Sequence, residues 1–351
     1  MISIGKRSAT VLKVLRDNAS AKGYRQQSRK LHAILSNRSI VRASGKDCEK
    51  LIQNLTTNDV KKISEGQGQL NGFLNPQGRT IAFAFLYRVG EDFFFDVDKD
   101  ALTEVLNGIK KFKLRSKITL TDVSQEMDIM AHWAGDEPIQ NTLISISDQR
   151  APQMGFRSII RKEDIGNTTL SDLKAYTAHR TIQGIAETSK EITIGGMPLE
   201  ENLDLMHGVD FRKGCYIGQE LTARTHHTGV IRKRIVPVSL SDHIESEVSQ
   251  IQHRPDAQFE LDHQLENGGS VDVRSEPIKK DSESTNGRPS KGRSAGKLLS
   301  VVDNIGLAML RLEQVNRWNK DLIMQIAGKE KPIHVRPWIP TWWPENVQQQ
   351  Q

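Results

Sequence analysis

The sequence is short of cysteine, of aromatic residues and of long apolar runs. Only two cysteines occur in 351 residues, Cys48 and Cys215, and they stand in no C-x-x-C arrangement. A disulfide framework is therefore not indicated, which is consistent with a reducing compartment. No run approaches the roughly 18 apolar residues that a membrane-spanning helix needs, so we expect no membrane segment. The length is sufficient for two or three domains with a sizeable core.

Positive charge is concentrated at the N-terminus. The net charge is +6, and residues 1–30 carry eight lysines and arginines against one acid, Asp17, together with several serines. This composition is typical of a mitochondrial transit peptide, so we predict that residues 1–30 direct the protein to the mitochondrial matrix. An ordinary basic tail is the alternative. The other basic residues form no stripe and accompany no nucleic-acid-binding motif, so we expect no nucleic-acid partner.

The first two thirds of the chain alternate strand and helix patterns, which predicts an α+β fold. Helices are expected at about 46–55, 98–113 and 172–183, and strands at 39–43, 70–74, 80–89, 93–97, 118–123 and 127–133. The segment Asn75 to Gly78 contains a proline and a closing glycine, and predicts a tight turn between two of these strands. Residues 135–170 show no periodic pattern, and we expect irregular structure there.

After residue 229 the pattern becomes that of a β domain, with strands expected at 230–240, 295–300 and 306–311. Between them, residues 242–292 are rich in polar residues and have Phe259 as their only aromatic residue. Such a segment buries too little apolar surface to offset the entropy of ordering it, so we interpret it as a disordered insertion. For the tryptophan-rich tail we favour packing on the β domain over covering a groove.

One stretch, residues 213–220, combines residue types that have little use in an apolar core. Its residues are, in order, Lys213, Gly214, Cys215, Tyr216, Ile217, Gly218, Gln219 and Glu220. Glycines on both sides of the thiol favour a sharp bend that presents the sulfur outward. Nearby cations such as Lys213 and Arg224 favour the thiolate, which is the form that binds metals and attacks electrophiles. The alternative is a small buried cysteine that only packs, and this is how we interpret Cys48.

The stretch 213–220 closely resembles the signature of the YgfZ branch of the aminomethyltransferase-like (glycine-cleavage T-protein, GcvT) superfamily. The flanking segments 179–185 and 198–209 are similar to that family as well, as are 57–59 and 75–79. The resemblance implies a three-part ring-like architecture. Residues 31–229 would form two intertwined α+β subdomains of the folate-binding type, and residues 230–345 a C-terminal β-barrel interrupted by the insertion 242–292.

The resemblance also implies a function. Mitochondrial members of this branch are late-acting iron-sulfur cluster assembly factors that support maturation of 4Fe-4S proteins together with A-type carrier proteins. A cluster usually needs about four ligands, mostly thiolates, so we do not expect a chain with two cysteines to hold one alone. We therefore expect Cys215 to be the reactive thiol and the metal ligand of a cluster shared with a partner.

Roles for the other signature residues follow from the same resemblance. Lys213 and Arg224 would set the local potential of the thiol, and Gly214 and Gly218 would shape the loop. Residues expected to brace the loop are Tyr216, Gln219 and Glu220.

Two further sites are predicted nearby. Glu200 is a candidate contact for tetrahydrofolate, again by resemblance. His226 and His227 would face opposite ways on a strand, so that at most one lies near Cys215.

A folate-dependent one-carbon transferase of the aminomethyl type is the alternative function. In T-proteins the hairpin that follows the glycine turn carries acidic residues, one of which positions the pterin. The corresponding run here, residues 78–84, offers no carboxylate that would orient or stabilise a reacting amine. We therefore expect a transferase-like fold without aminomethyltransferase activity.

Overall fold

The computed structural model describes residues 31–135, 137–166, 170–244, 249–261, 265, 269–278, 292–329 and 331–348. The predicted transit peptide, residues 1–30, lies outside the described residues. Within them, no helix combines the length and apolar character that crossing a membrane requires.

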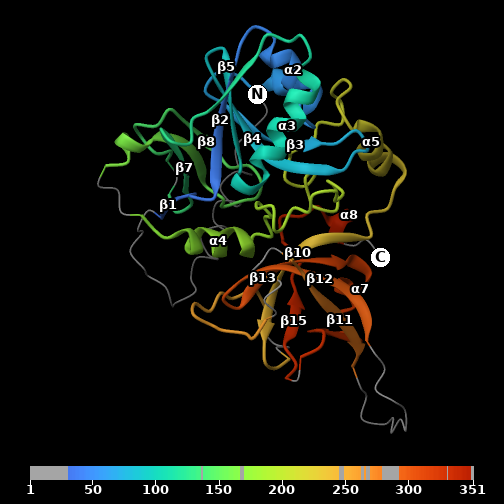
Figure 1. Ribbon diagram of the computed structural model, residues 1–351. Helices are drawn as coiled ribbons and strands as arrows, with labels where there is room; N and C mark the ends of the chain where they lie inside the picture. Colours follow the sequence, from blue (N-terminus) through green and yellow to red (C-terminus); the bar gives the residue numbers. More distant parts are fainter. Residues whose placement is uncertain are drawn as a thin grey trace, which may run out of the picture. The chain divides into compact units, whose positions relative to one another are not determined.

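The first layer is an antiparallel five-stranded sheet. Its strands, in spatial order, are β3 (Gly68–Leu74), β4 (Thr80–Val89), β5 (Asp92–Asp98), β2 (Arg38–Ser44) and β6 (Thr119–Asp122). Helices α2 (Cys48–Leu55) and α3 (Leu102–Lys113) pack against it through an apolar cluster that contains Phe93 and Phe95 (Figure 1). Short 3-10 helices, η1 (Val60–Lys62) and η2 (Lys99–Ala101), flank these elements. The predicted hairpin between 70–74 and 80–89 is confirmed by the pairing of β3 with β4.

A second, four-stranded antiparallel sheet has the order β1 (His32–Ile34), β7 (Met127–His132), β9 (Phe156–Arg161) and β8 (Ile144–Ser147). The prediction of irregular structure over 135–170 is therefore wrong for β8 and β9. Two features explain why the sequence did not predict these strands. Strand β8 has only four residues, and β9 places Arg157 in the core, which breaks the apolar pattern. The 3-10 helix η3 (Lys162–Asp164) follows β9.

The segment that follows leads to the signature. Helix α4 (Leu173–Ile182) begins at Asp172, whose side chain accepts a hydrogen bond from Ala175 N. Non-helical chain then runs to Gly218, where helix α5 (Gln219–Thr228) begins.

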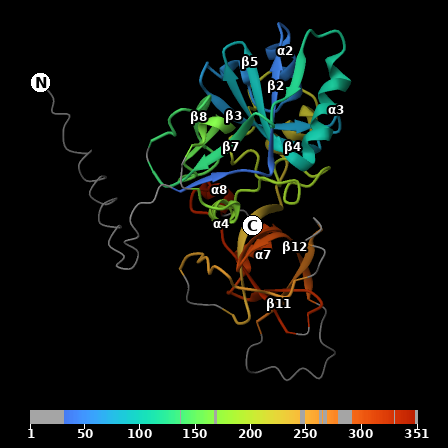
Figure 2. The same ribbon diagram turned by 60° about the vertical axis from the view of Figure 1, so that its left-hand side comes forward.

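The C-terminal part is a closed antiparallel barrel, seen from two sides in Figures 1 and 2. Its strands, in order, are β10 (Lys233–Ser241), β13 (Ile305–Arg311), β12 (Arg293–Val302), β11 (Val271–Pro277), β14 (Leu322–Ile326) and β15 (His334–Pro337). Short helices α7 (Leu312–Arg317) and α8 (Glu345–Gln348) accompany it. Trp343 is buried in the barrel core, so the tail packs there as we favoured.

Strand β11 corrects the prediction of a disordered insertion over 242–292. Val271, Val273 and Ser275 are buried, whereas the charged residues between them face outward. This period-2 alternation places one face of the strand in the core. The sequence did not predict β11 because the average composition of residues 242–292 is polar. Residues 245–248, 262–264, 266–268 and 279–291 of that segment lie outside the described residues.

Candidate functional site

The thiol of Cys215 is exposed and free. Three residues later, Gly218 begins helix α5 with φ of +80°. A Cβ at this position would lie 2.4 Å from Asn75 O and 2.9 Å from Gly78 Cα. Glycine is thus required at 218 both by the backbone conformation and by space. The signature stretch is thereby packed against the turn between β3 and β4.

Gly214 has a different status from Gly218. Its φ lies outside the left-handed region, and an added Cβ would meet no atom within 4 Å. The bend before the thiol therefore does not depend on glycine at 214.

Lys213 ties the thiol loop to the end of helix α2. It is buried, and its ammonium donates to the carbonyl oxygens of Gln53 at 2.7 Å, Thr56 at 2.7 Å and Asn58 at 2.8 Å. Carbonyls at the C-terminal end of a helix lack intrahelical donors, and a cation suits them. Burial lowers the pKa of Lys213 to about 8. These three bonds give Lys213 an anchoring contact, and its predicted effect on the local potential of the thiol stays a prediction.

Tyr216 and Gln219 brace the loop from the other side. The Gln219 Oε1 atom accepts from Tyr216 N at 3.3 Å, and Gln219 N donates to Tyr216 O at 3.3 Å. Tyr216 is buried, which raises its pKa to about 12. Ile217 adds a bond from its N to Asn54 O at 2.9 Å and packs on the apolar cluster under α2 and α3.

The remaining signature side chains are on helix α5 and face solvent. Glu220 and Arg224 are exposed and, among the described residues, form no ion pair. His226 and His227 also lie on α5, so the strand that we expected there is wrong. The ring of His226 stacks on Phe211 with centroids 3.6 Å apart, and His227 meets His226 edge-on at 5.1 Å.

No group of three or more His, Cys, Asp or Glu residues in the described part of the chain is arranged to hold a metal ion. Cys215 therefore belongs to no complete set of metal ligands among these residues. The Cys215 thiol is accessible from solvent. Its loop is held by the contacts of Lys213, Gly218 and Gln219. Such a thiol can bind a metal centre only when other ligands arrive from outside.

Glu200 does not form part of a pocket near the thiol. Its carboxylate pairs with Lys233 at 3.1 Å on β10. Its neighbour Glu201 is fully buried. Glu201 contacts Thr80 Oγ1 at 2.6 Å and Thr193 N at 2.9 Å, and burial raises its pKa to about 8. No pattern in the sequence distinguishes these two adjacent glutamates.

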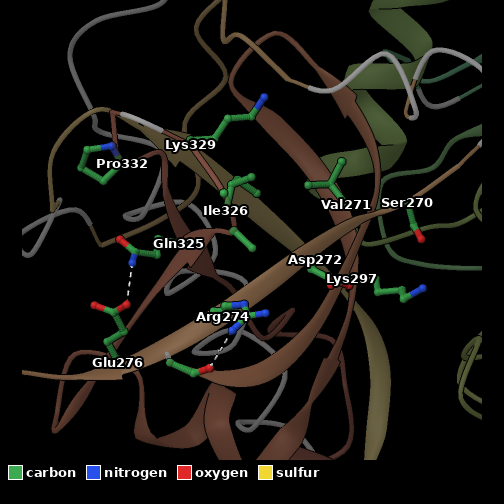
Figure 3. A pocket seen from close by; sticks show the side chains of 13 residues that line it. Ser270, Val271, Asp272, Arg274, Glu276, Lys297, Gln325, Ile326, Lys329 and Pro332 are labelled. Carbon is green, nitrogen blue, oxygen red and sulfur yellow. Dashed lines mark hydrogen bonds between the residues drawn. The ribbon is translucent and has the colours of Figure 1, made fainter. Parts of the chain in front are cut away.

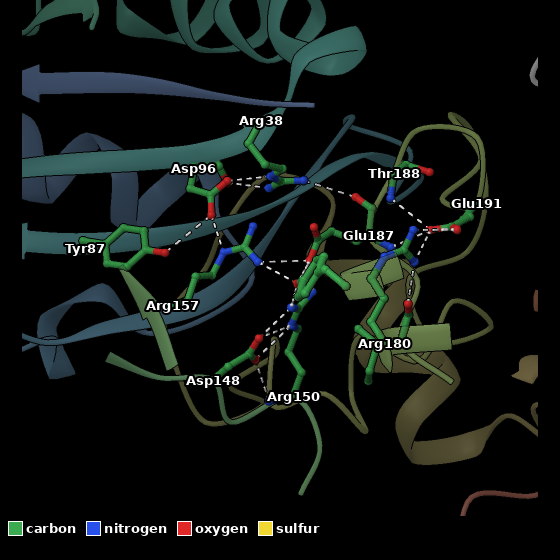
Figure 4. A network of polar contacts seen from close by, with 12 residues as sticks. Arg38, Tyr87, Asp96, Asp148, Arg150, Arg157, Arg180, Glu187, Thr188 and Glu191 are labelled. Atoms are coloured by element: carbon green, nitrogen blue, oxygen red, sulfur yellow. Dashed lines mark hydrogen bonds and ion pairs between the residues drawn. The ribbon is translucent and has the colours of Figure 1, made fainter. Parts of the chain in front are cut away.

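A buried network of charges joins the two sheets, which the sequence did not reveal (Figure 4). Asp96 on β5 receives the guanidinium groups of Arg38 on β2 and Arg157 on β9. Glu187 accepts from Arg150 at 2.6 Å and from Arg157 at 3.1 Å. Burial opposes ionisation of Glu187, but the two arginines outweigh it and hold its pKa well below the usual range.

Two residues of this network, Asp148 and Arg150, also line a cavity that we compared with the predicted folate site. This cavity, of about 580 Å³, is lined by residues 147–156, Gly135, His207 and Trp342. Its one carboxylate, Asp148, is held by Arg150 at 2.6 Å, and Glu200 is not among the lining residues. This cavity therefore does not bring the predicted folate contact, Glu200, together with its lining residues.

Another cavity belongs to the barrel wall. It has a volume of about 830 Å³ and is lined by residues of β11, β12 and β14 (Figure 3). Polar lining groups bond to one another, as Gln325 Nε2 does to Glu276 Oε1 at 2.8 Å. No signature residue lines this cavity.

The comparisons with known proteins cover both parts of the molecule. Residues 232–345 match the model of the CAF17 C-terminal beta-barrel domain. Over 90% of its length the chain is 40% identical to a protein of Mycosarcoma maydis named "Iron-sulfur cluster assembly factor IBA57 homolog, mitochondrial", and covers 85% of it. A protein of the same name in Pyricularia oryzae is 32% identical, with 88% and 83% covered.

The fold comparison gives the same architecture. The glycine cleavage system aminomethyltransferase T of Bartonella henselae superposes with a TM-score of 0.61, at 11% identity, over 90% of this chain and 87% of that one. This likeness confirms the predicted α+β fold of the T-protein type with a C-terminal β-barrel.

Proposed function

The chain belongs to the family of mitochondrial IBA57 iron-sulfur cluster assembly factors, and we propose that Cys215 carries its part in assembly by ligating a cluster shared with a partner protein. The observation that carries this proposal is the exposed, free thiol of Cys215 on a rigidly held loop. The cluster is a substrate that is transferred between proteins and is not a resident cofactor of this chain. Its other ligands come from the partner, because the described residues hold no group of three or more His, Cys, Asp or Glu that could bind a metal ion with the thiol.

The residues around Cys215 suit a thiol that binds a cluster already assembled on another protein. Lys213 and Gln219 hold the loop through bonds to backbone atoms, so the sulfur is presented without movement of the loop. Arg224, exposed one helical turn into α5, adds positive charge on the same element. Thiolate-ligated clusters are anionic, and positive charge nearby favours their approach.

For the partner we propose an A-type iron-sulfur carrier protein in the mitochondrial matrix, with maturation of 4Fe-4S proteins as the outcome. The mitochondrial relatives and the leader-like composition of residues 1–30 support the location. A carrier that already holds a cluster with its own thiolates supplies the ligands that this chain lacks.

The transferase alternative gains no observation from the structure. Residues 78–84, which form the turn and the start of β4, contain no carboxylate. Glu200 is paired with Lys233 and Asp148 with Arg150. The proposed mechanism assigns no step to tetrahydrofolate.

The experiment compares two single-cysteine variants in the presence of an A-type carrier, ferrous iron and sulfide. Wild type and Cys48→Ala, in which the buried cysteine is removed, are expected to form a complex with a visible cluster absorption and an EPR signal after reduction. Cys215→Ser is expected to lose the complex and to fail in rescuing 4Fe-4S enzymes in mitochondria. Normal rescue by Cys215→Ser would remove the thiol from the mechanism.

A further inference from the structure

An apolar groove of about 210 Å³ lies between helix α3 and the turn that joins β3 to β4. These elements are adjacent in Figure 1. The groove floor is formed mainly by six side chains, Leu55, Phe73, Ile81, Val105, Ile109 and Phe112. A groove of this size accommodates one or two apolar side chains of another protein.

The groove is continuous with the thiol loop. Asn75 and Pro76 line the groove, and Asn75 is the residue against which Gly218 packs. Ile217, two residues after Cys215, packs on the same apolar cluster as Ile81 and Phe112. A protein that binds in the groove would therefore also reach the face that carries the thiol.

The end of α3 adds a strained apolar side chain and positive charge. Leu114 follows the helix with φ of +46° and is 88% exposed. Leucine rarely adopts positive φ, and such strain often marks functional surfaces. Lys110, Lys111 and Arg115 are exposed around it, with Glu104 as the one acid that lines the groove. A partner face with carboxylates is complementary to this charge.

We propose that this groove is the docking site of the cluster-carrying partner, which inserts an apolar side chain flanked by acidic residues beside α3. The inference rests on the proposed function of Cys215. The groove and Leu114 would contribute the apolar contacts, and the cluster would bridge the two proteins at the thiol.

Gly108 offers a test that leaves the core intact. It lies in the middle of α3 on the groove wall, and a Cβ there would meet only Ile81 Cδ1, at 3.9 Å. Gly108→Met fills the groove from its open side, whereas Gly108→Ala adds one methyl group and serves as the matched control. Both variants are expected to melt at or above the wild-type temperature, because glycine is unfavourable inside a helix.

The measurement is the Kd for an A-type carrier loaded with its cluster, together with the cluster absorption at saturation. Gly108→Met is expected to bind at least about tenfold more weakly, which corresponds to roughly 1.4 kcal/mol, with an unchanged spectrum at saturation because Cys215 is intact. Gly108→Ala should bind nearly as wild type. Equal affinity of the two variants overturns the docking site and leaves the proposed function standing.

A charge reversal tests the chemistry of the partner. Lys111→Glu is expected to weaken binding and to make it less dependent on salt, while Lys320→Glu, exposed on the barrel, should change neither. If wild type forms no cluster-containing complex at all, both the proposed function and the docking site are overturned.

Discussion

Substituting Glu201 by glutamine should change how the stability of the protein depends on pH. Glu201 is fully buried, and burial raises the pKa of its carboxyl from 4.5 to about 8. The carboxyl accepts from Thr193 N and from Thr80 Oγ1, and the Thr80 hydroxyl can rotate to accept from a protonated carboxyl. Glutamine places a carbonyl oxygen and an N–H at the same two atoms, so Glu201→Gln copies the neutral form and removes the titration.

The sign follows from proton binding. Between pH 4.5 and about 8 the folded state keeps a proton on Glu201 that the unfolded state has released. The free energy of unfolding therefore falls as pH rises through this window. One pKa unit corresponds to about 1.4 kcal/mol, so from about pH 5.5 to about pH 7.5 the wild type should lose roughly 3 kcal/mol relative to Glu201→Gln.

The assay is urea denaturation of both proteins at several pH values across this window. Glu220→Gln is the matched control, because Glu220 is exposed on α5 and, among the described residues, forms no ion pair, so its removal should leave the pH dependence as in wild type. Parallel stability curves for wild type and Glu201→Gln would refute the assignment of a buried neutral carboxyl.

Four further substitutions, each followed by urea denaturation, test how the thiol loop is held and how much the buried charge network between the two sheets contributes to stability. Lys213→Met strands three carbonyls and should cost about 3 kcal/mol; a neutral result would contradict the anchoring contact. Gly218→Ala should cost at least about 2 kcal/mol, while Gly214→Ala should stay within about 0.5 kcal/mol; similar costs would refute the distinction. Asp96→Asn leaves Arg38 and Arg157 short of their counter-charge and should cost about 4 kcal/mol, and an unchanged midpoint would show that the network contributes little.

The sequence predicted those elements whose local pattern is strong. The hairpin β3–β4 has two apolar strands and a proline-glycine turn, and α3 has apolar residues at helical spacing. Strand β8 has four residues, too few to establish a period. Strand β11 alternates cleanly, but it lies within a long polar segment whose average composition suggested disorder. The closure of the barrel depends on pairings between strands far apart in the chain, which no local pattern contains.

The role of Cys215 was predicted from the signature stretch and stays a prediction, with which the exposure of the residue agrees. The contacts that hold the loop around it were not predictable. The target of Lys213, three carbonyls about 155 residues earlier in the chain, follows only from the fold. The same holds for the buried arginines Arg38, Arg150 and Arg157, each of which looks in the sequence like a surface residue.

The measurement that tests the central claim most directly is alkylation of Cys215 by iodoacetamide, read by mass spectrometry. The thiol should react in the free chain, be protected in the complex with the cluster-loaded carrier, and react again once a chelator has removed the cluster. The same carrier without its cluster controls for simple shielding and should leave Cys215 reactive. Alkylation of Cys215 at the same rate with and without the cluster would contradict its role as a ligand.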